Sequence, residues 1–276
     1  MRAFPRYGYL GLAVIAMAHV FAARHQQPVS TFFTPIVWTG YIAAVDAFVF
    51  MLRGNSLIMN QPKQFLACTL LSIPLWTIFE VYNLRLENWQ YIGLPPHWLP
   101  RYLGYGWAFA TIWPGMLETS QLLRALGFWS KPQTPWKLSR TGQNIWIVIG
   151  AVMLIVPWVL PKHIAAYTFG LVWLGFIFLL EPLNLRRSAA SILDDLELGR
   201  RDRLWSLLAS GAICGFLWEF WNYQATARWI YIFPIFQHMK LFEMPLPGFL
   251  GFPPFALETF AMYCFTVRFL DYVPDI

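Results

Sequence analysis

The sequence contains few charged residues and few cysteines. Only 12% of its 276 residues are Asp, Glu, Lys or Arg, whereas soluble domains carry about 25%. This shortage argues against a soluble globular protein and, despite a net charge of +6, against a nucleic-acid partner. The three cysteines have no metal-type spacing and fall in apolar stretches, so we expect small buried side chains at Cys68, Cys214 and Cys264.

Several catalytic motifs are also missing. The chain has no glycine-rich nucleotide loop, no Gly-x-Ser-x-Gly elbow, no cysteine–histidine pair and no haem-attachment motif. Soluble-type phosphoryl transfer and serine hydrolysis are therefore not expected, and no motif identifies a cofactor. A metal site made from His25, Glu80 and His97 is conceivable, but no ligand spacing such as His-x-x-x-His supports it. We predict no metal site.

Long apolar stretches are what the sequence has instead. A helix needs about 20 mostly apolar residues to cross a bilayer. Eight stretches qualify, namely 9–23, 32–52, 65–82, 102–123, 145–160, 165–180, 204–223 and 246–270. We predict an all-α polytopic membrane protein with about eight transmembrane helices. The first stretch has no cleavage pattern of small residues after it, so we expect a retained helix and not a signal peptide.

Lysine and arginine are unevenly distributed between these stretches. With the N-terminus inside, the inner segments carry fourteen of the twenty basic residues and the outer segments carry six. Inner segments of membrane proteins are enriched in Lys and Arg. We therefore expect an integral membrane protein of a bacterial cytoplasmic membrane, with both termini in the cytoplasm.

The two halves of the chain share a pattern of residues in the same order. The offset between matching residues stays between 135 and 140 positions throughout. The matches are Trp38, Gly40 and Asp46 with Trp173, Gly175 and Glu181, then Glu80 and Asn83 with Glu219 and Asn222, Trp89 and Tyr91 with Trp229 and Tyr231, and Pro114 and Glu118 with Pro254 and Glu258. This order predicts two repeats, 1–133 and 134–276, with four helices each. Because an even number of crossings preserves orientation, the repeats should be parallel.

Carboxylates within apolar stretches are functional candidates, because a charge inside the bilayer is costly. Glu80 and Asn83 share one helix face, as do Glu219 and Asn222. Each pair precedes a long aromatic outer loop whose Trp and Tyr side chains suit the headgroup layer. Two roles for these loops stay open: they could only anchor the protein in the headgroup layer, or they could form part of a binding site.

Two prolines each precede a glutamate by four positions, Pro114 before Glu118 and Pro254 before Glu258. Proline leaves a helix carbonyl without its partner, and membrane helices tolerate this where neighbours or water satisfy the carbonyl. A polar cavity inside the bundle would explain the pattern. The alternative is that the two glutamates only bond helix backbones or each other.

These motifs resemble those of the membrane lycopene cyclase and carotenoid hydratase proteins. The residues that carry the resemblance are Glu219, Asn222, Trp229, Tyr231, Pro245 and 254–258, with weaker counterparts in the first half. The resemblance implies an enzyme that acts on long polyenes inside the bilayer and uses carboxylates as proton donors. Here, threonine follows Glu118 and Glu258, where the cyclase motif has paired glutamates.

Our first hypothesis is an enzyme that acts on a lipid-soluble, isoprenoid-like substrate by carboxylate acid–base chemistry. The catalytic candidates are Glu258 and Glu219, their counterparts Glu118 and Glu80, and Asn222 and Asn83, which would orient a carboxyl group or a substrate oxygen. The candidates for binding the substrate and stabilising a carbocation are Trp229, Tyr231, Trp89, Tyr91 and Trp218.

Two alternatives stay open. One is a non-catalytic lipid- or pigment-binding subunit of a membrane complex, and the other is a transporter with carboxylates at the midplane. The partners expected from the sequence are membrane lipid, a hydrophobic small molecule and, for the first alternative, other subunits of the complex.

Overall fold

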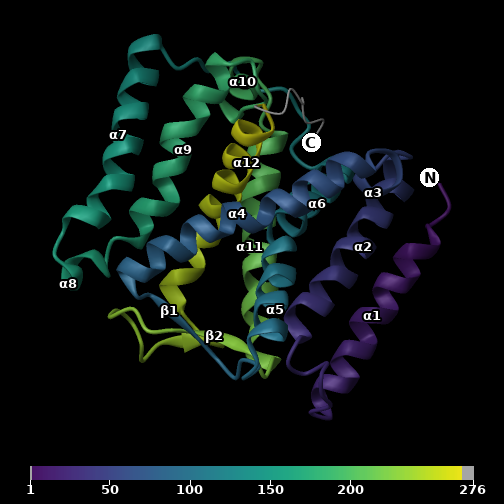
Figure 1. Cartoon of the computed structure of the whole chain (residues 1–276). Coiled ribbons are helices and arrows are strands. Elements are labelled where there is room, and N and C mark those ends of the chain that lie inside the picture. Colours follow the sequence, from purple (N-terminus) through teal and green to yellow (C-terminus); the bar gives the residue numbers. More distant parts are fainter. Residues whose placement is uncertain (1, 269–276) are drawn as a thin grey trace.

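The chain, seen here in a computed structural model that describes residues 2–268, is mostly helical (Figure 1). Among these residues, six helices are long and apolar enough to cross a membrane. They are α1 (Arg6–Ala23), α2 (Phe33–Arg53), α4 (Pro62–Leu86), α7 (Arg140–Val159), α9 (Phe169–Arg186) and α11 (Asp202–Gln224). The helical membrane character predicted from the sequence is therefore confirmed, with six long helices where eight were expected.

The two remaining predicted spans are broken. The stretch 102–123 is divided into α5 (Trp98–Ala110) and α6 (Ile112–Ala125), and the Thr111 hydroxyl between them donates to the Ala108 carbonyl at 2.7 Å. The stretch 246–270 begins as the 3-10 helix η1 (Leu246–Gly251) and continues as α12 (Phe252–Arg268), while its predicted end lies outside the described residues. Both breaks lie in the proline-containing segments of the sequence.

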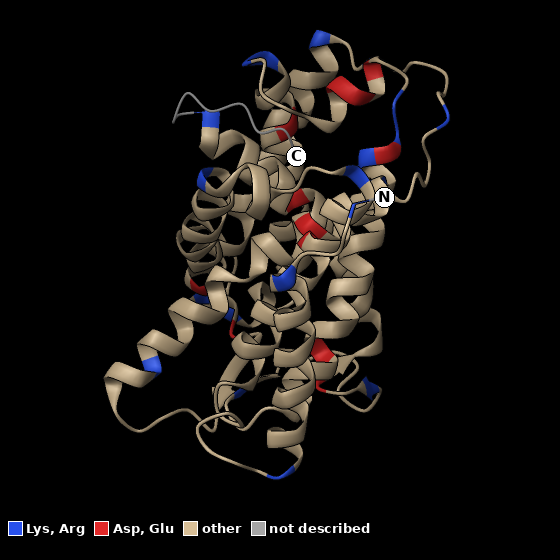
Figure 2. Cartoon of the chain, turned by 90° about the vertical axis from the view of Figure 1, so that its right-hand side faces the viewer, with Lys and Arg blue, Asp and Glu red and all other residues tan. Residues whose placement is uncertain are grey.

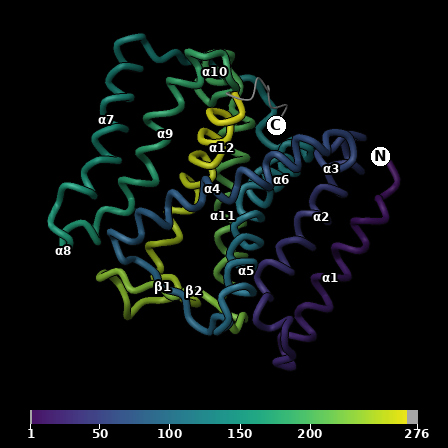
Figure 3. The backbone as a smooth tube through the Cα atoms, viewed as in Figure 1, coloured from purple at the N-terminus to yellow at the C-terminus, as the bar shows by residue number. Residues whose placement is uncertain are grey.

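Helices α1 and α2 lie together at one edge of the molecule, and α7 and α9 lie together at the other (Figure 1). Between them, α12 packs against both α9 and α11, and α11 also packs against α6. The tube in Figure 3 follows α4 obliquely across the front of this central group. The interior of the bundle is thus built from helices of both halves.

Each edge pair packs through glycines. A Cβ atom on Gly11 of α1 would lie 2.5 Å from the carbonyl oxygen of Gly40 of α2. A Cβ atom on Gly150 of α7 would lie 2.7 Å from the carbonyl oxygen of Gly175 of α9. Small residues at such crossings let membrane helices approach closely. The two edge pairs therefore use the same kind of contact.

Short helices follow α2 and α9, and a carboxylate holds each of them. Asp46 accepts hydrogen bonds from the Ser56 hydroxyl and the Ile58 N–H, both at 2.8 Å, at the start of α3 (Leu57–Asn60). Glu181 accepts from the Ile192 N–H at 2.7 Å, at the start of α10 (Ile192–Glu197). Carboxylates are favourable at helix N-termini. Two carboxylates of the repeated pattern, Asp46 and Glu181, thus have a structural role.

A short antiparallel ribbon joins the two halves. Strand β1 (Trp89–Ile92) follows α4, and β2 (Arg228–Tyr231) follows α11. Trp89 pairs with Tyr231, and Tyr91 pairs with Trp229. A second small ribbon consists of β3 (Lys240–Leu241) and β4 (Met244–Pro245), and the short helix α8 (Lys162–Ala165) precedes α9. The two aromatic loops predicted from the sequence are therefore tied to each other in part by backbone hydrogen bonds.

Charged residues gather toward the end of the molecule near the N-terminus and away from the β1–β2 ribbon (Figures 1 and 2). Asp195 of α10 accepts from Arg200 at 2.7 Å and from Arg203 at 2.6 Å at this end. The three cysteines lie inside the bundle and are all buried, as predicted.

Candidate functional site

A cavity of about 540 Å³ lies beside the β1–β2 ribbon. Its walls come mainly from α5, α9, α11, α12, η1 and the ribbon, with further residues from α2 and α4, and most of the lining side chains are apolar or aromatic. Small-molecule sites commonly have volumes of roughly 300–1,000 Å³ and mainly apolar walls. In size and lining, the cavity therefore suits an apolar small molecule.

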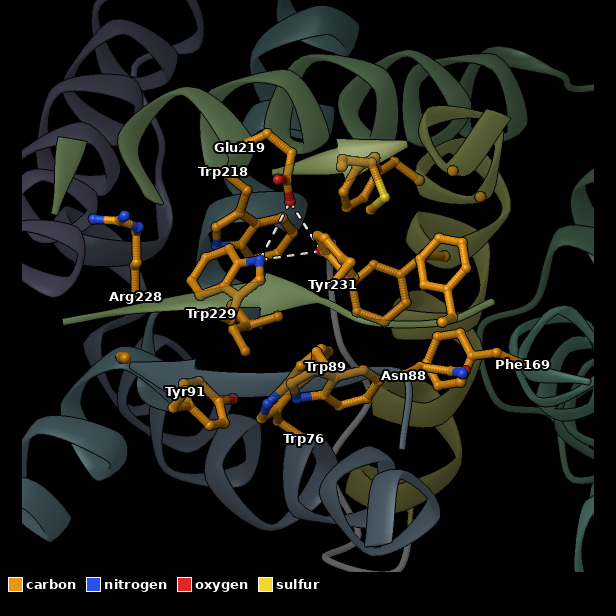
Figure 4. Close-up of a pocket in the computed structure, with 18 of the residues that line it drawn as sticks. Trp76, Asn88, Trp89, Tyr91, Phe169, Trp218, Glu219, Arg228, Trp229 and Tyr231 are labelled. Carbon is orange, nitrogen blue, oxygen red and sulfur yellow. Dashed lines mark hydrogen bonds between the residues drawn. The ribbon is translucent and has the colours of Figure 1, made fainter. Parts of the chain in front are cut away.

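Glu219 of α11 places a carboxyl group on this wall (Figure 4). The residue is fully buried. Its Oε1 atom accepts from the Tyr231 hydroxyl at 2.9 Å and from the Trp229 indole N–H at 3.3 Å. Its Oε2 atom has no hydrogen-bond partner among the described residues. One carboxyl oxygen is thus held by two donors, and the other is buried without a donor among the described residues.

The Tyr231 hydroxyl is a stable donor to this carboxyl group. Tyr231 lies on β2, outside the long helices. Burial is the main cause that raises the pKa of this phenol well above its ordinary range, and the neighbouring Glu219 carboxylate raises the pKa further. The phenol therefore stays protonated, and it orients Glu219 at any physiological pH.

Glu80 of α4 has a similar set of donors but a different position. Its Oε1 atom accepts from the Tyr91 hydroxyl at 2.6 Å and from the indole N–H groups of Trp76 and Trp89 at 2.9 and 3.3 Å. Trp76, Trp89 and Tyr91 line the cavity, whereas Glu80 does not. The predicted counterparts Glu80 and Glu219 therefore differ in their access to the cavity.

The two asparagines hold the strands on the helices that precede them. The Asn222 amide donates to the Trp229 carbonyl at 2.8 Å and accepts from the Trp229 N–H at 3.0 Å. The Asn83 amide donates to the Trp89 carbonyl at 2.8 Å and accepts from the Asn88 N–H at 2.8 Å. Neither amide lines the cavity. These amides contact strand and loop backbone, whereas the sequence suggested that they orient a carboxyl or substrate oxygen.

Glu118 and Glu258 are fully buried, and neither lines the cavity. Within residues 2–268, both carboxyl oxygens of Glu118 and both of Glu258 are buried without a hydrogen-bond partner that meets the distance and angle limits, and Glu118 lies near the Asp46 carboxylate. The neighbouring α12 residue Thr259 accepts a hydrogen bond at its carbonyl from the Trp113 indole at 2.8 Å. Of the proline–glutamate pattern, Pro254 lines the cavity, whereas both glutamates lie in the packed interior of the bundle.

The structure brings five of the predicted aromatic residues to the cavity and adds others. Trp89, Tyr91, Trp218, Trp229 and Tyr231, which the sequence analysis proposed as substrate-binding residues, all line it. The sequence analysis missed Trp76 and Trp173. Trp76 could have been found, because it lies four residues before Glu80 on one helix face. Trp173 belongs to the repeated pattern, but nothing in the sequence around it indicated that it would line a binding site.

Residues 2–268 contain no group of three or more His, Cys, Asp or Glu side chains that could hold a metal ion. Comparisons with protein-family models, with curated proteins and with solved structures found no match for this chain. The geometry of the cavity therefore carries the functional argument.

Proposed function

We propose that this chain is an integral membrane enzyme that acts on a lipid-soluble, isoprenoid-like molecule, with Glu219 as its general acid. The observation that carries the proposal is the buried Glu219 carboxyl group on the wall of a mainly apolar, aromatic cavity of about 540 Å³. A polyene or similar apolar chain fits such walls, and a carboxyl group is a suitable proton donor. The resemblance of the surrounding motifs to membrane lycopene cyclases and carotenoid hydratases points in the same direction.

In this mechanism, Glu219 donates its proton to one carbon of a double bond. A C–H bond forms, and the neighbouring carbon becomes a cation, which the faces of the lining tryptophans stabilise. Tyr231 and Trp229 donate to the carboxylate that is left behind, and such charge-assisted hydrogen bonds are strong. Loss of a different proton from the cation to Glu219 then gives an isomer and restores the acid, without any co-reactant.

We also propose that the chain consists of two parallel repeats, 1–133 and 134–276, which cross a bacterial cytoplasmic membrane eight times. The α5–α6 pair and the η1–α12 pair would be the fourth and eighth crossings. Three matched features support the duplication: the glycine contacts of α1–α2 and α7–α9, the carboxylates at α3 and α10, and the register of β1 with β2. That register is reciprocal, because Trp89 pairs with Tyr231 and Tyr91 pairs with Trp229.

A non-catalytic lipid- or pigment-binding subunit is a second candidate, which one observation favours. Helix α5 lines the cavity, yet none of its residues is buried. It exposes Trp98, Tyr102, Leu103 and Trp107. Within a membrane, such a helix faces lipid or the apolar surface of another subunit.

Glu219→Gln tests the enzymatic proposal. The wild-type protein, Glu219→Gln and Glu80→Gln are purified from membranes, and their bound small molecules are extracted and compared by absorbance and mass spectrometry. Glu80→Gln is the matched comparison, since Glu80 has similar donors but does not line the cavity. Loss of a general acid typically slows a reaction by about 10²–10⁴-fold. We expect product with the wild type and Glu80→Gln, and the unreacted isomer with Glu219→Gln.

Two results would contradict this proposal. If Glu219→Gln carries the same molecule as the wild type, Glu219 is not the acid. That result would favour a non-catalytic binding subunit. If no apolar small molecule is extracted from any of the three proteins, the cavity is not its binding site.

A further inference from the structure

Four residues that line the cavity carry a buried polar atom with no hydrogen-bond partner among the described residues: Thr34 Oγ1, Trp173 Nε1, Glu219 Oε2 and Arg228 Nε. Arg228 Nε forms an ion pair with Glu243 at 3.3 Å. The Trp173 indole on α9 is a rigid donor, which unlike a hydroxyl cannot rotate to another partner. Three of the four other indoles of the wall, those of Trp76, Trp89 and Trp229 but not Trp218, are already used: Trp76 and Trp89 donate to Glu80, and Trp229 donates to Glu219. Buried polar groups in native proteins nearly always have a partner, so each exception calls for an explanation.

The packing of Trp173 fixes the direction of its N–H. A Cβ atom on Gly251 would lie 1.5 Å from Cζ3 and 2.3 Å from Cε3 of the Trp173 ring. This edge of the indole therefore rests on the Gly251 backbone, and the N–H, on the opposite edge, points away from it. Around the ring lie the aromatic side chains of Phe169, Phe252 and Phe255, with ring centres 4.9–6.3 Å away. These side chains offer the N–H no strong acceptor.

Trp38 of α2 is the counterpart of Trp173 in the first half. Its Cζ3 and Cε3 atoms rest on Gly115 in the same way, at 2.9 and 3.1 Å from where a Cβ atom would be. Its indole nitrogen is likewise buried and has no hydrogen-bond partner in the part of the chain that the structure describes. Trp38, however, is fully buried and does not line the cavity. Only one of these two matched N–H groups is therefore on a residue that a ligand in the cavity can reach.

We infer that the ligand of this cavity is an apolar chain that carries an oxygen function, of the isoprenoid-alcohol class, and not a pure hydrocarbon. Its oxygen accepts a hydrogen bond from the Trp173 N–H, while the aromatic walls hold the apolar part. The inference rests on the proposed function, because it uses the same cavity and leaves Glu219 as the group that acts on the ligand. A neutral hydrogen bond of this kind corresponds to roughly three- to tenfold in affinity.

The test compares farnesol with β-farnesene, an unsaturated hydrocarbon with the same number of carbons. Equilibrium binding of each radiolabelled probe is measured to the full chain in lipid nanodiscs, with empty nanodiscs subtracted. We expect the wild type to bind farnesol more tightly than farnesene. Trp173→Phe, which keeps an aromatic ring but removes the N–H, should weaken farnesol binding roughly three- to tenfold more than it weakens farnesene binding. Trp38→Phe should change neither affinity.

The outcomes separate the inference from the proposed function. Equal wild-type affinities for the two probes, or a farnesol preference that survives Trp173→Phe, would overturn the inference and leave the apolar cavity as a binding site. If neither probe binds, the binding role of the cavity fails, and the inference fails with it. Should Trp173→Phe not fold, as judged by size-exclusion chromatography, the wild-type comparison of the two probes still decides.

Discussion

At the scale of single residues, the interior depends on contacts between tryptophan and glycine. The ring of Trp173 rests on Gly251 and the ring of Trp38 rests on Gly115. A Cβ atom at Gly251 would overlap the Trp173 ring at 1.5 Å, whereas one at Gly115 would meet the Trp38 ring at 2.9 Å. The contact at Gly251 therefore leaves no room for a methyl group. At Gly115, the Trp38 ring would need to move only slightly to make room for one.

We predict that Gly251→Ala destabilises the protein more than Gly115→Ala does. Overpacking a well-packed interior typically costs about 1–3 kcal/mol, and displacement of Trp173 should also reshape the cavity wall. Thermal unfolding of both variants and the wild type in the same detergent measures the difference. A Gly251→Ala protein with the melting temperature of the wild type would show that this contact is loose.

The sequence identified part of the site at this scale. The repeated Glu-x-x-Asn and Trp-x-Tyr motifs led to Glu219, Trp218, Trp229 and Tyr231, which all line the cavity. The same reasoning gave equal weight to Glu258, which does not line it. Burial and cavity access depend on how separate helices pack, and a local motif contains no information about that. A bond such as Asn222 to the Trp229 backbone also becomes visible only once the intervening turn is folded.

At the scale of elements, the sequence analysis counted 102–123 and 246–270 as single spans, and proline explains why the first of them is broken. Proline at position 114 cannot bond the carbonyl four residues earlier, and the helix is interrupted there, between α5 and α6 at Thr111. The β1–β2 ribbon could not be predicted in the same way. Each strand has only four residues, and Trp89 pairs with a residue of the other half, Tyr231. Short strands without local pairing leave little periodic signal.

At the scale of the whole molecule, the basic residues predict one orientation in the membrane. We expect the linker at Ser130 to face the cytoplasm and the loop at Gln237 to face outward, because the inner segments carry most of the Lys and Arg. Both residues are exposed, and the three native cysteines are buried. In intact cells, a membrane-impermeant maleimide should label Gln237→Cys readily and Ser130→Cys only after permeabilisation.

The unsubstituted chain is the control for this labelling, since its buried cysteines should react little. The reverse pattern of labelling would place the cavity and the ribbon on the cytoplasmic side. That pattern would also contradict the proposed orientation of both halves in the membrane.

The central claim is that the cavity beside the β1–β2 ribbon holds a lipid-soluble molecule against Glu219. An experimental density map of the protein, purified in nanodiscs with the lipids of its own membrane, tests this claim most directly. We expect elongated density within the cavity of about 540 Å³, in contact with Glu219 and Trp173. A cavity closed by its own side chains, with lipid density only on the outer faces of the helices, would contradict the account.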